Sequence, residues 1–245
     1  MSKREKYSNV VILTGAGISR ESGLETFRDK DGIWAKVSID DVATPRAFAR
    51  DPDRVHAFYN ARRRKLLSPS IQPNTAHLAL AKMEKLWPGK VILVTQNIDD
   101  LHERAGSTNV THMHGQLLEA VCTSCHKVTP CREDLATTMT CPVCSSKGTL
   151  RPNVVWFGEQ VMAGDFIEEA ARKCGLFLSI GTSGTVYPAA ALVEEAKSAN
   201  AHTVELNLEA SSSFSSFDEI IEGPATVVVP RYVDELFNER GIGSG

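Results

Sequence analysis

Residues Val10–Ser19, VVILTGAGIS, decide the fold, because an apolar run ends there directly in a glycine turn. The run is rich in β-branched residues, as buried parallel strands are. Gly15 and Gly17 allow a tight turn and the close approach of a phosphate near a helix N-terminus. The pattern G-x-G-x-x-G is incomplete, because its sixth position is Arg20. Alone, the stretch predicts a strand and a turn and leaves nucleotide binding open.

Further apolar runs of the same kind follow along the chain, with helical patterns between them. The pattern at residues 74–87 has Asn74 as its N-cap, and others cover residues 166–174 and 187–199. Strands that alternate with helices predict an α/β fold with a doubly wound parallel sheet. The later runs, each expected to be a strand, are Lys90–Thr95, Leu176–Gly181, His202–Leu208 and Ala225–Pro230.

Four of the six cysteines form two C-x-x-C pairs separated by fifteen residues. The N-terminus shows no apolar segment of a secretory signal, so the pairs indicate zinc rather than disulfides. Four thiolates leave no open position for water, so the zinc is expected to be structural. Cys131 and Cys174 have no such partner, and Cys174 is expected in the core. The four expected ligands are Cys122, Cys125, Cys141 and Cys144.

Composition narrows the class of protein. The chain has 245 residues, of which 42% are hydrophobic and 23% charged, with a net charge of -3. That charge gives no case for bulk binding to nucleic acid or to a membrane surface. No apolar run approaches the roughly 20 residues that span a bilayer. We therefore expect a cytoplasmic protein without nucleic-acid or membrane partners.

Seven motifs together are more specific than any one of them. GAGIS with SG and FR, TQNID, HMHG, the cysteine pairs, RPNVVWFGE, GTS and NLE occur in this order between Gly15 and Glu209. In type and order they resemble the sirtuin family of NAD-dependent protein lysine deacylases. Because the motifs cover nearly the whole chain, the resemblance extends to the complete fold.

The resemblance implies a Rossmann-like NAD-binding domain and a smaller domain of helical and zinc-ribbon modules, with NAD in the cleft between them. The large domain is expected to comprise residues 1–37, 88–118 and 156–245, the helical module 38–87 and the zinc module 119–155. The residues that match the family's NAD contacts are Gly15, Ala16, Gly17, Phe27, Arg28, Gln96, Asn97, Ile98, Asp99, Gly181, Thr182, Ser183, Asn207, Leu208, Glu209 and Ala225.

The resemblance also implies the reaction. Acyl groups leave lysines of proteins and peptides, and the products are nicotinamide, O-acyl-ADP-ribose and free lysine. His114 would be the general base for a ribose hydroxyl, a role that suits an imidazole titrating near neutral pH. Asn97 and Asp99 complete the expected catalytic set. Val155 and Phe157 would border the acyl-lysine and pair with the peptide backbone, and we expect a monomer.

The stretch Asp40–Arg64 resembles sirtuins that act on succinyl, malonyl or glutaryl groups. In that subgroup a Tyr-x-x-Arg pair reads the acyl carboxylate, and here the pair is Tyr59 and Arg62. An arginine fork and a phenol can both donate to a carboxylate. Ala43 matches the small residue that leaves room for a longer chain. The basic residues that follow, from Arg63 to Lys65, are expected to be solvated.

Two alternative functions remain open at this point. The same NAD site would serve mono-ADP-ribosyl transfer to a protein acceptor. A catalytically inactive NAD-binding and zinc-binding interaction module is the other alternative, which the intact TQNID and HMHG motifs disfavour. An ordinary Rossmann dehydrogenase is disfavoured, because the third glycine is missing and no acidic residue follows at the expected distance.

Overall fold

The computed structural model describes residues 7–26, 32–184, 189–211 and 217–238. Its centre is a parallel sheet with the strand order β3-β2-β1-β7-β8-β9. The chain winds outward from β1 in both directions, which makes the sheet doubly wound, as predicted. The strands are β1 (Val10–Thr14), β2 (Val91–Thr95), β3 (Val110–His112), β7 (Leu176–Ile180), β8 (His202–Asn207) and β9 (Glu219–Glu222).

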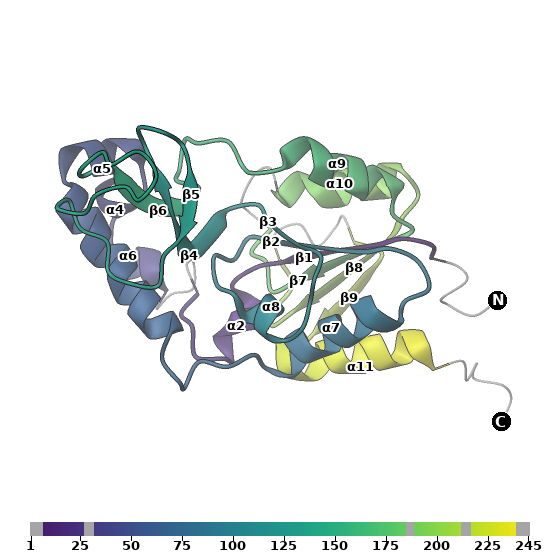
Figure 1. Cartoon of the computed structure of the whole chain (residues 1–245). Coiled ribbons are helices and arrows are strands. Elements are labelled where there is room, and N and C mark those ends of the chain that lie inside the picture. The colour runs from purple at the N-terminus through teal and green to yellow at the C-terminus, as the bar shows by residue number, and fades with distance from the viewer. Residues whose placement is uncertain (1–6, 27–31, 185–188, 212–216, 239–245) are drawn as a thin grey trace, which may run out of the picture.

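Helices cover both faces of this sheet (Figure 1). Val10 and Ile12 pack in one hydrophobic core, whereas Val11 and Leu13 pack in the core on the opposite face. Successive side chains of a strand point to opposite faces, so a strand buried on both sides is apolar throughout. One face carries α7 (Thr75–Leu86) and α11 (Ala225–Phe237), and the other carries α9 (Gly164–Lys173), η1 (Ala189–Ala191) and α10 (Leu192–Ser198).

Four of the five predicted strands are confirmed as β1, β2, β7 and β8. The fifth, Ala225–Pro230, is wrong, because these residues begin helix α11. Its valines continue into a helical pattern with Tyr232 and Leu236, and that face packs into the core shared with α7. The N-cap at Asn74 is confirmed, and its side chain accepts from the backbone of Ala76 and His77 in a capping box.

A second, smaller unit lies beyond one end of the sheet (Figure 1). It combines the antiparallel sheet β5-β4-β6 with the helices α4, α5 and α6. The division of the chain into domains at the boundaries given above stays a prediction. The bounds are β4 (Gly115–Cys122), β5 (Val128–Pro130), β6 (Leu150–Val154), α4 (Ile39–Val42), α5 (Pro45–Arg50) and α6 (Pro52–Leu66); short helices are α2 (Gly17–Arg20), α3 (Ile33–Lys36) and α8 (Leu101–Arg104).

Across the described parts of the chain, none of the helices combines the length and the apolar character needed to cross a bilayer.

Helix α6 joins the helical part of the small unit to its sheet through buried polar side chains. His56 Nε2 donates to the carbonyl of Leu150 at 3.0 Å. Asn60 donates to the carbonyl of Leu135 at 2.8 Å and accepts from its N–H at 2.9 Å. We call these side chains, with Arg63, the α6 seam. Each bond joins a side chain of α6 to a backbone group of the small sheet or its loops, so the seam fixes α6 against the sheet.

Arg63 contradicts the expectation that it lies in solvent. Its side chain is fully buried. Its Nε donates to the carbonyl of Leu117 at 3.1 Å, and Nη1 donates to Asn60 Oδ1 at 2.8 Å. Leu117 lies at a β-bulge of β4, where the ladder to β6 is interrupted, so its carbonyl needs a partner from elsewhere. Within the basic run Arg62–Lys65, Arg63 is therefore a buried structural residue rather than a solvated one.

Replacing Arg63 with alanine is expected to lower the free energy of unfolding by about 3 kcal/mol, from the cavity and from acceptors left without donors. Arg64→Ala is the matched control on the same helix turn. Arg64 pairs with Asp134 in solvent, and the exposed fraction of its side chain is 61%. Losing such a pair costs less than about 1 kcal/mol. Urea unfolding of both variants measures the difference, and equal losses would contradict the assignment.

Candidate functional site

A cleft of about 1430 Å³ runs along the edge of the parallel sheet where its strands end. Ligands bind at the carboxyl ends of strands in doubly wound folds, on either side of the point where the strand order reverses. Ordinary ligand pockets are about 300–1,000 Å³, so this cleft has room for a dinucleotide with a second substrate. From the last residue of β8 and the turns after β1, β2, β7 and β8, it is lined by Gly15, Ala16, Gly17, Gln96, Asn97, Ile98, Gly181, Thr182, Ser183, Asn207, Leu208 and Glu209.

The cleft also reaches the small unit. Of the predicted acyl-lysine contacts, Ala43, Tyr59, Val155 and Phe157 line it, and so do His114 and Ala225. Asp99 is buried beneath the cleft and does not line it. Arg62 does not line it either and is half-buried one helical turn beyond Tyr59. Phe27 and Arg28, both predicted NAD contacts, lie outside the described residues.

The glycine turn after β1 packs directly on the turn after β7. Gly17 donates its N–H to the carbonyl of Gly181 at 2.9 Å, and Gly15 donates to that of Ile180 at 2.9 Å. A Cβ on Gly17 would lie 2.7 Å from the Cα of Gly181, closer than carbon atoms approach. The glycines are therefore needed for contact between the two turns, which brings both polar loops to one side of the cleft.

Ser19 links the predicted catalytic residues beneath the cleft. Its hydroxyl donates to Asp99 Oδ2 at 3.0 Å and receives a bond from Asn97 Nδ2 at 3.2 Å. The Asn97 amide also donates to the carbonyl of Gly15 at 3.1 Å. Burial raises the pKa of Asp99 to about 6, although bonds from Leu101 and Ser19 favour its charged form. This network ties the TQNID segment to the glycine turn.

His114 has a defined tautomer. Its Nδ1 lies 3.0 Å from the carbonyl oxygen of Gln96, which can only accept, so Nδ1 carries the proton. In the neutral imidazole Nε2 then has a free lone pair, and it has no hydrogen-bond partner among the described residues. Burial lowers the pKa of His114 below the ordinary value for histidine. The side chain is thus a neutral proton acceptor at the wall of the cleft.

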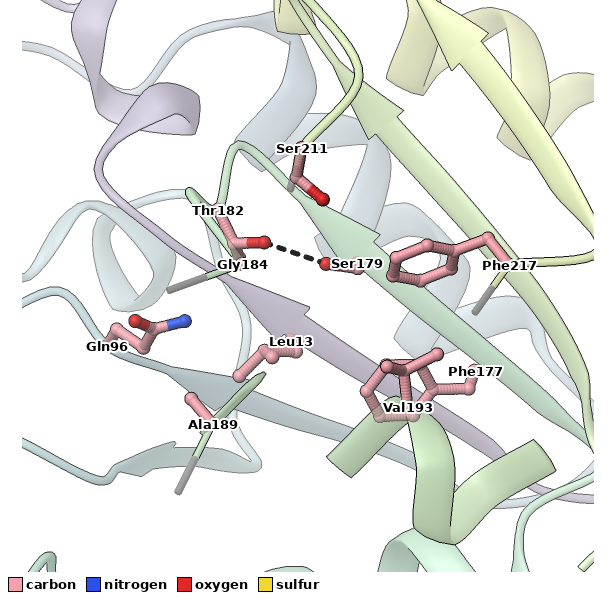
Figure 2. Close-up of a pocket in the computed structure, with 10 residues that line it drawn as sticks. All are labelled: Leu13, Gln96, Phe177, Ser179, Thr182, Gly184, Ala189, Val193, Ser211 and Phe217. Atoms are coloured by element: carbon pink, nitrogen blue, oxygen red, sulfur yellow. Dashed lines mark hydrogen bonds between the residues drawn. The ribbon is translucent and has the colours of Figure 1, made fainter. Parts of the chain in front are cut away.

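A cavity of about 10 Å³, the size of one water molecule, lies next to the cleft and is lined by Gln96, Ser179 and Thr182 among others (Figure 2). Gln96 and Thr182 border both this cavity and the cleft. Inside the cavity the hydroxyls of Ser179 and Thr182 lie 2.9 Å apart and hydrogen-bond. The Thr182 hydroxyl is therefore oriented by the strand end below it rather than free to rotate.

The predicted acyl end of the cleft is aromatic. Trp156 Nε1 donates to the hydroxyl of Tyr59 at 3.0 Å, and the main-chain N–H of Phe157 donates to the carbonyl of Ala43 at 3.0 Å. The Arg62 guanidinium lies 3.4 Å above the ring of Phe58 and donates to its carbonyl at 3.2 Å. The contact of Trp156 with Tyr59 was not predicted, because 97 positions separate the two residues and no local pattern indicates it.

The four predicted zinc ligands come together at the far end of the small sheet. Their sulfur atoms all lie within 4.8 Å of one another. Cys122 and Cys144 are 3.7 Å apart, and Cys125 and Cys141 are 3.9 Å apart. A tetrahedral zinc with Zn–S bonds of about 2.3 Å separates its sulfurs by about 3.8 Å. The cluster therefore fits one zinc ion, whereas Cys131 stands apart and bonds the carbonyl of Glu133.

Comparison with protein families finds a match to the model described as the Sir2 family over residues 15–188. An NAD-dependent protein deacylase of Vibrio parahaemolyticus is 53% identical over 230 residues, covering 94% of this chain and 95% of that protein. An NAD-dependent protein deacylase of Escherichia coli K12 is 53% identical over 235 residues, covering 96% of this chain and 84% of that protein.

Solved structures agree with the sequence comparison. A Sir2 homologue in complex with NAD superposes with a TM-score of 0.86 at 38% identity, covering 96% of this chain and 91% of that one. The ADP-ribose complex of a Sir2 homologue variant gives 0.89 at 37% identity, with coverage of 96% and 94%. A Sir2 complex with a p53 peptide and NAD+ gives 0.80 at 28% identity, with coverage of 95% of both chains.

Proposed function

Because this chain belongs to the Sir2 family and is an NAD-dependent protein lysine deacylase, we propose that it removes acidic acyl groups such as succinyl and malonyl as well as acetyl. The carrying observation is a pair of hydrogen-bond donors without acceptors on one turn of α6: the Tyr59 hydroxyl, which borders the cleft, and the buried Nε of Arg62, which lies one turn beyond it. Such donors are costly when buried, and a carboxylate is the acceptor that satisfies both.

The first donor is the Tyr59 hydroxyl. Its oxygen accepts from Trp156, and no described residue accepts its proton. Burial raises the pKa of Tyr59 to about 12, so the proton stays in place at neutral pH. The second is Arg62, whose Nε is buried and has no hydrogen-bond partner among the described residues. Burial lowers its pKa to about 10, which still leaves the guanidinium charged at neutral pH.

The positive charge of Arg62 also favours a carboxylate at the acyl end of the cleft. No carboxylate among the described residues forms an ion pair with Arg62, and the neighbouring Glu25 instead pairs with Lys36 at 2.7 Å. A half-buried cation without a counter-ion attracts an anion from solution. Ala43 adds space, because its small side chain leaves the end of the cleft open beside Tyr59. A four-carbon acyl chain ending in a carboxylate suits these features.

His114 is the proposed general base. Its Nδ1–H is held by Gln96, so Nε2 accepts the proton of a ribose hydroxyl without a change of tautomer. NAD, when bound, supplies the electrophilic ribose carbon that takes the acyl oxygen. Asn97 and Asp99 act by holding Ser19 and the glycine turn in place, since both are occupied by internal bonds. The turns after β7 and β8 would hold the rest of the dinucleotide.

The acylated peptide would lie along the segment after β6. The N–H groups of Val155 and Phe157 already donate to the carbonyls of His114 and Ala43. Pairing with a peptide backbone therefore falls to the carbonyl oxygens of these residues. Recognition of backbone rather than side chains leaves many lysines as substrates. Monomeric state and a cytoplasmic location remain expectations from the sequence.

Replacing Arg62 with methionine is expected to lower kcat/KM for succinyl-lysine peptides roughly 30-fold or more relative to acetyl-lysine peptides, because truncating one partner of a buried charged contact costs about 2–5 kcal/mol. Methionine keeps the apolar length that packs on Phe58. Steady-state kinetics on paired peptides of one sequence measures the ratio. Arg64→Met, on the exposed side of the same helix, is the control. An equal loss of kcat/KM for both peptides would rule out recognition of the acyl carboxylate by Arg62.

A further inference from the structure

Trp156 lies between Tyr59, which we propose recognises the acyl carboxylate, and the ion pair of Arg151 with Glu159, which we call the charged clamp. On one side its Nε1 donates to the Tyr59 hydroxyl at 3.0 Å. On the other, the Arg151 guanidinium lies 3.4 Å above its ring. The exposed fraction of Trp156 is 2%, and the residue lines the cleft beside Tyr59. Its position thus has consequences for Tyr59 that the neighbouring Val155 and Phe157 do not have.

The direction of the Trp156–Tyr59 bond is fixed by chemistry. An indole N–H donates and never accepts, so the hydroxyl oxygen of Tyr59 is the acceptor. A phenol that accepts at its oxygen directs its own proton to another site. None of the residues that the structure describes takes that proton, and Tyr59 borders the cleft. The indole therefore makes Tyr59 a donor toward whatever occupies the acyl end of the cleft.

We infer that Trp156 is a specificity-determining positioning residue, which selects acyl groups with a terminal acceptor by holding the Tyr59 hydroxyl as a donor. The inference rests on the proposed carboxylate recognition by Tyr59 and Arg62. Acetyl presents no oxygen at that depth, so the oriented proton finds no partner there. Succinyl and malonyl carry a carboxylate, which accepts it. Discrimination between acidic acyl groups and acetyl then depends on the direction of the Tyr59 hydroxyl proton as well as on the charge of Arg62.

The clamp keeps the indole in place. Arg151 forms a bidentate pair with Glu159 at 2.7 and 2.9 Å, and its Nη2 also donates to the carbonyl of Val154 at 2.7 Å. The same Glu159 carboxylate accepts the main-chain N–H of Trp156 at 2.8 Å. The ring is thus stacked on one face by a cation that is itself held at both ends, which fixes the plane of its N–H.

The test removes the indole N–H of Trp156 and measures selectivity between succinyl-lysine and acetyl-lysine peptides. Trp156→Phe is expected to lower the ratio of kcat/KM for succinyl-lysine over acetyl-lysine by about 3- to 10-fold, the effect of one hydrogen bond. Replacing Trp156 with 3-benzothienylalanine, which keeps the ring shape and carries sulfur instead of N–H, is expected to give the same fall. Trp87→Phe is the matched control, because Trp87 is also buried and its N–H has no partner among the described residues.

A double-mutant cycle with Tyr59→Phe separates positioning from packing. If Trp156 acts through the hydroxyl, its replacement changes the ratio in the wild type and leaves it unchanged once Tyr59 is phenylalanine. A full additional effect in that background overturns the inference, and so does an unchanged ratio for benzothienylalanine when Tyr59→Phe alone lowers it. An unchanged ratio for Tyr59→Phe and for Arg62→Met overturns the proposed carboxylate recognition together with the inference.

Discussion

Replacing His114 with alanine is expected to lower kcat/KM for every acyl-lysine peptide by roughly 10²- to 10⁴-fold, the contribution of a positioned general base. The loss is expected for acetyl and succinyl peptides alike, because the base acts on the ribose and not on the acyl group. The hydrogen bond from Nδ1 to Gln96 matters here, since it leaves Nε2 as the acceptor. His202→Ala is a control at the opposite end of the sheet, where His202 begins β8.

The pH profile gives an independent measurement of the same role. A base must be neutral, so activity rises with pH through the pKa of His114 and is lost as the imidazole becomes protonated below it. Burial lowers that pKa, so the acid limb of kcat/KM is expected below the ordinary histidine value. An acid limb that survives in His114→Ala would belong to another group, and Asp99, with a pKa of about 6, is the nearest candidate.

Loss of zinc is expected to have the largest effect on stability. The core of the zinc module consists of Ala120, Cys122, Cys131, Leu135, Cys141 and Leu150, so half of its buried residues are cysteines. Structural zinc contributes apparent binding free energies of about 10–16 kcal/mol in small modules, and no comparable apolar core is present to replace it. We expect Cys141→Ala to release the metal, unfold residues around β5 and abolish deacylation.

Metal content, hydrogen exchange and activity measure this together. Cys131→Ala is the matched control, because Cys131 belongs to the same core but its sulfur bonds the carbonyl of Glu133 and is not one of the four clustered sulfurs. It is expected to keep one zinc ion per chain. Full metal content in Cys141→Ala, or equal metal loss in the two variants, would argue against the four-cysteine site.

The sequence predicts elements well where one pattern has one physical cause. Buried parallel strands are apolar on both faces, and β1, β2, β7 and β8 were found for that reason. The run beginning at Ala225 has the same composition but forms a helix, because its apolar side chains repeat with helical spacing beyond Pro230. β3 and β9 were missed, since they are short and half-exposed edge strands.

The residues of the candidate site also differ in whether the sequence could predict their positions. Motifs at strand ends, from the glycine turn to Asn207, could be placed along one cleft because the fold brings the ends of parallel strands together. Contacts between segments far apart in sequence could not be predicted. Arg63 and Arg64 are neighbours of the same type, and only their positions on α6 decide that one is buried and the other exposed.

The α6 seam has a consequence for substrate choice. The helix that carries Tyr59 is bonded through His56, Asn60 and Arg63 to backbone groups of the metal-binding sheet and its loops. Tyr59 can therefore keep its place at the cleft only while that sheet keeps its own. Under the proposed carboxylate recognition, substitutions around the metal that displace α6 by a fraction of an ångström are expected to alter acyl preference without touching the acyl pocket. On that proposal, residues that never contact the substrate can change acyl selectivity during evolution.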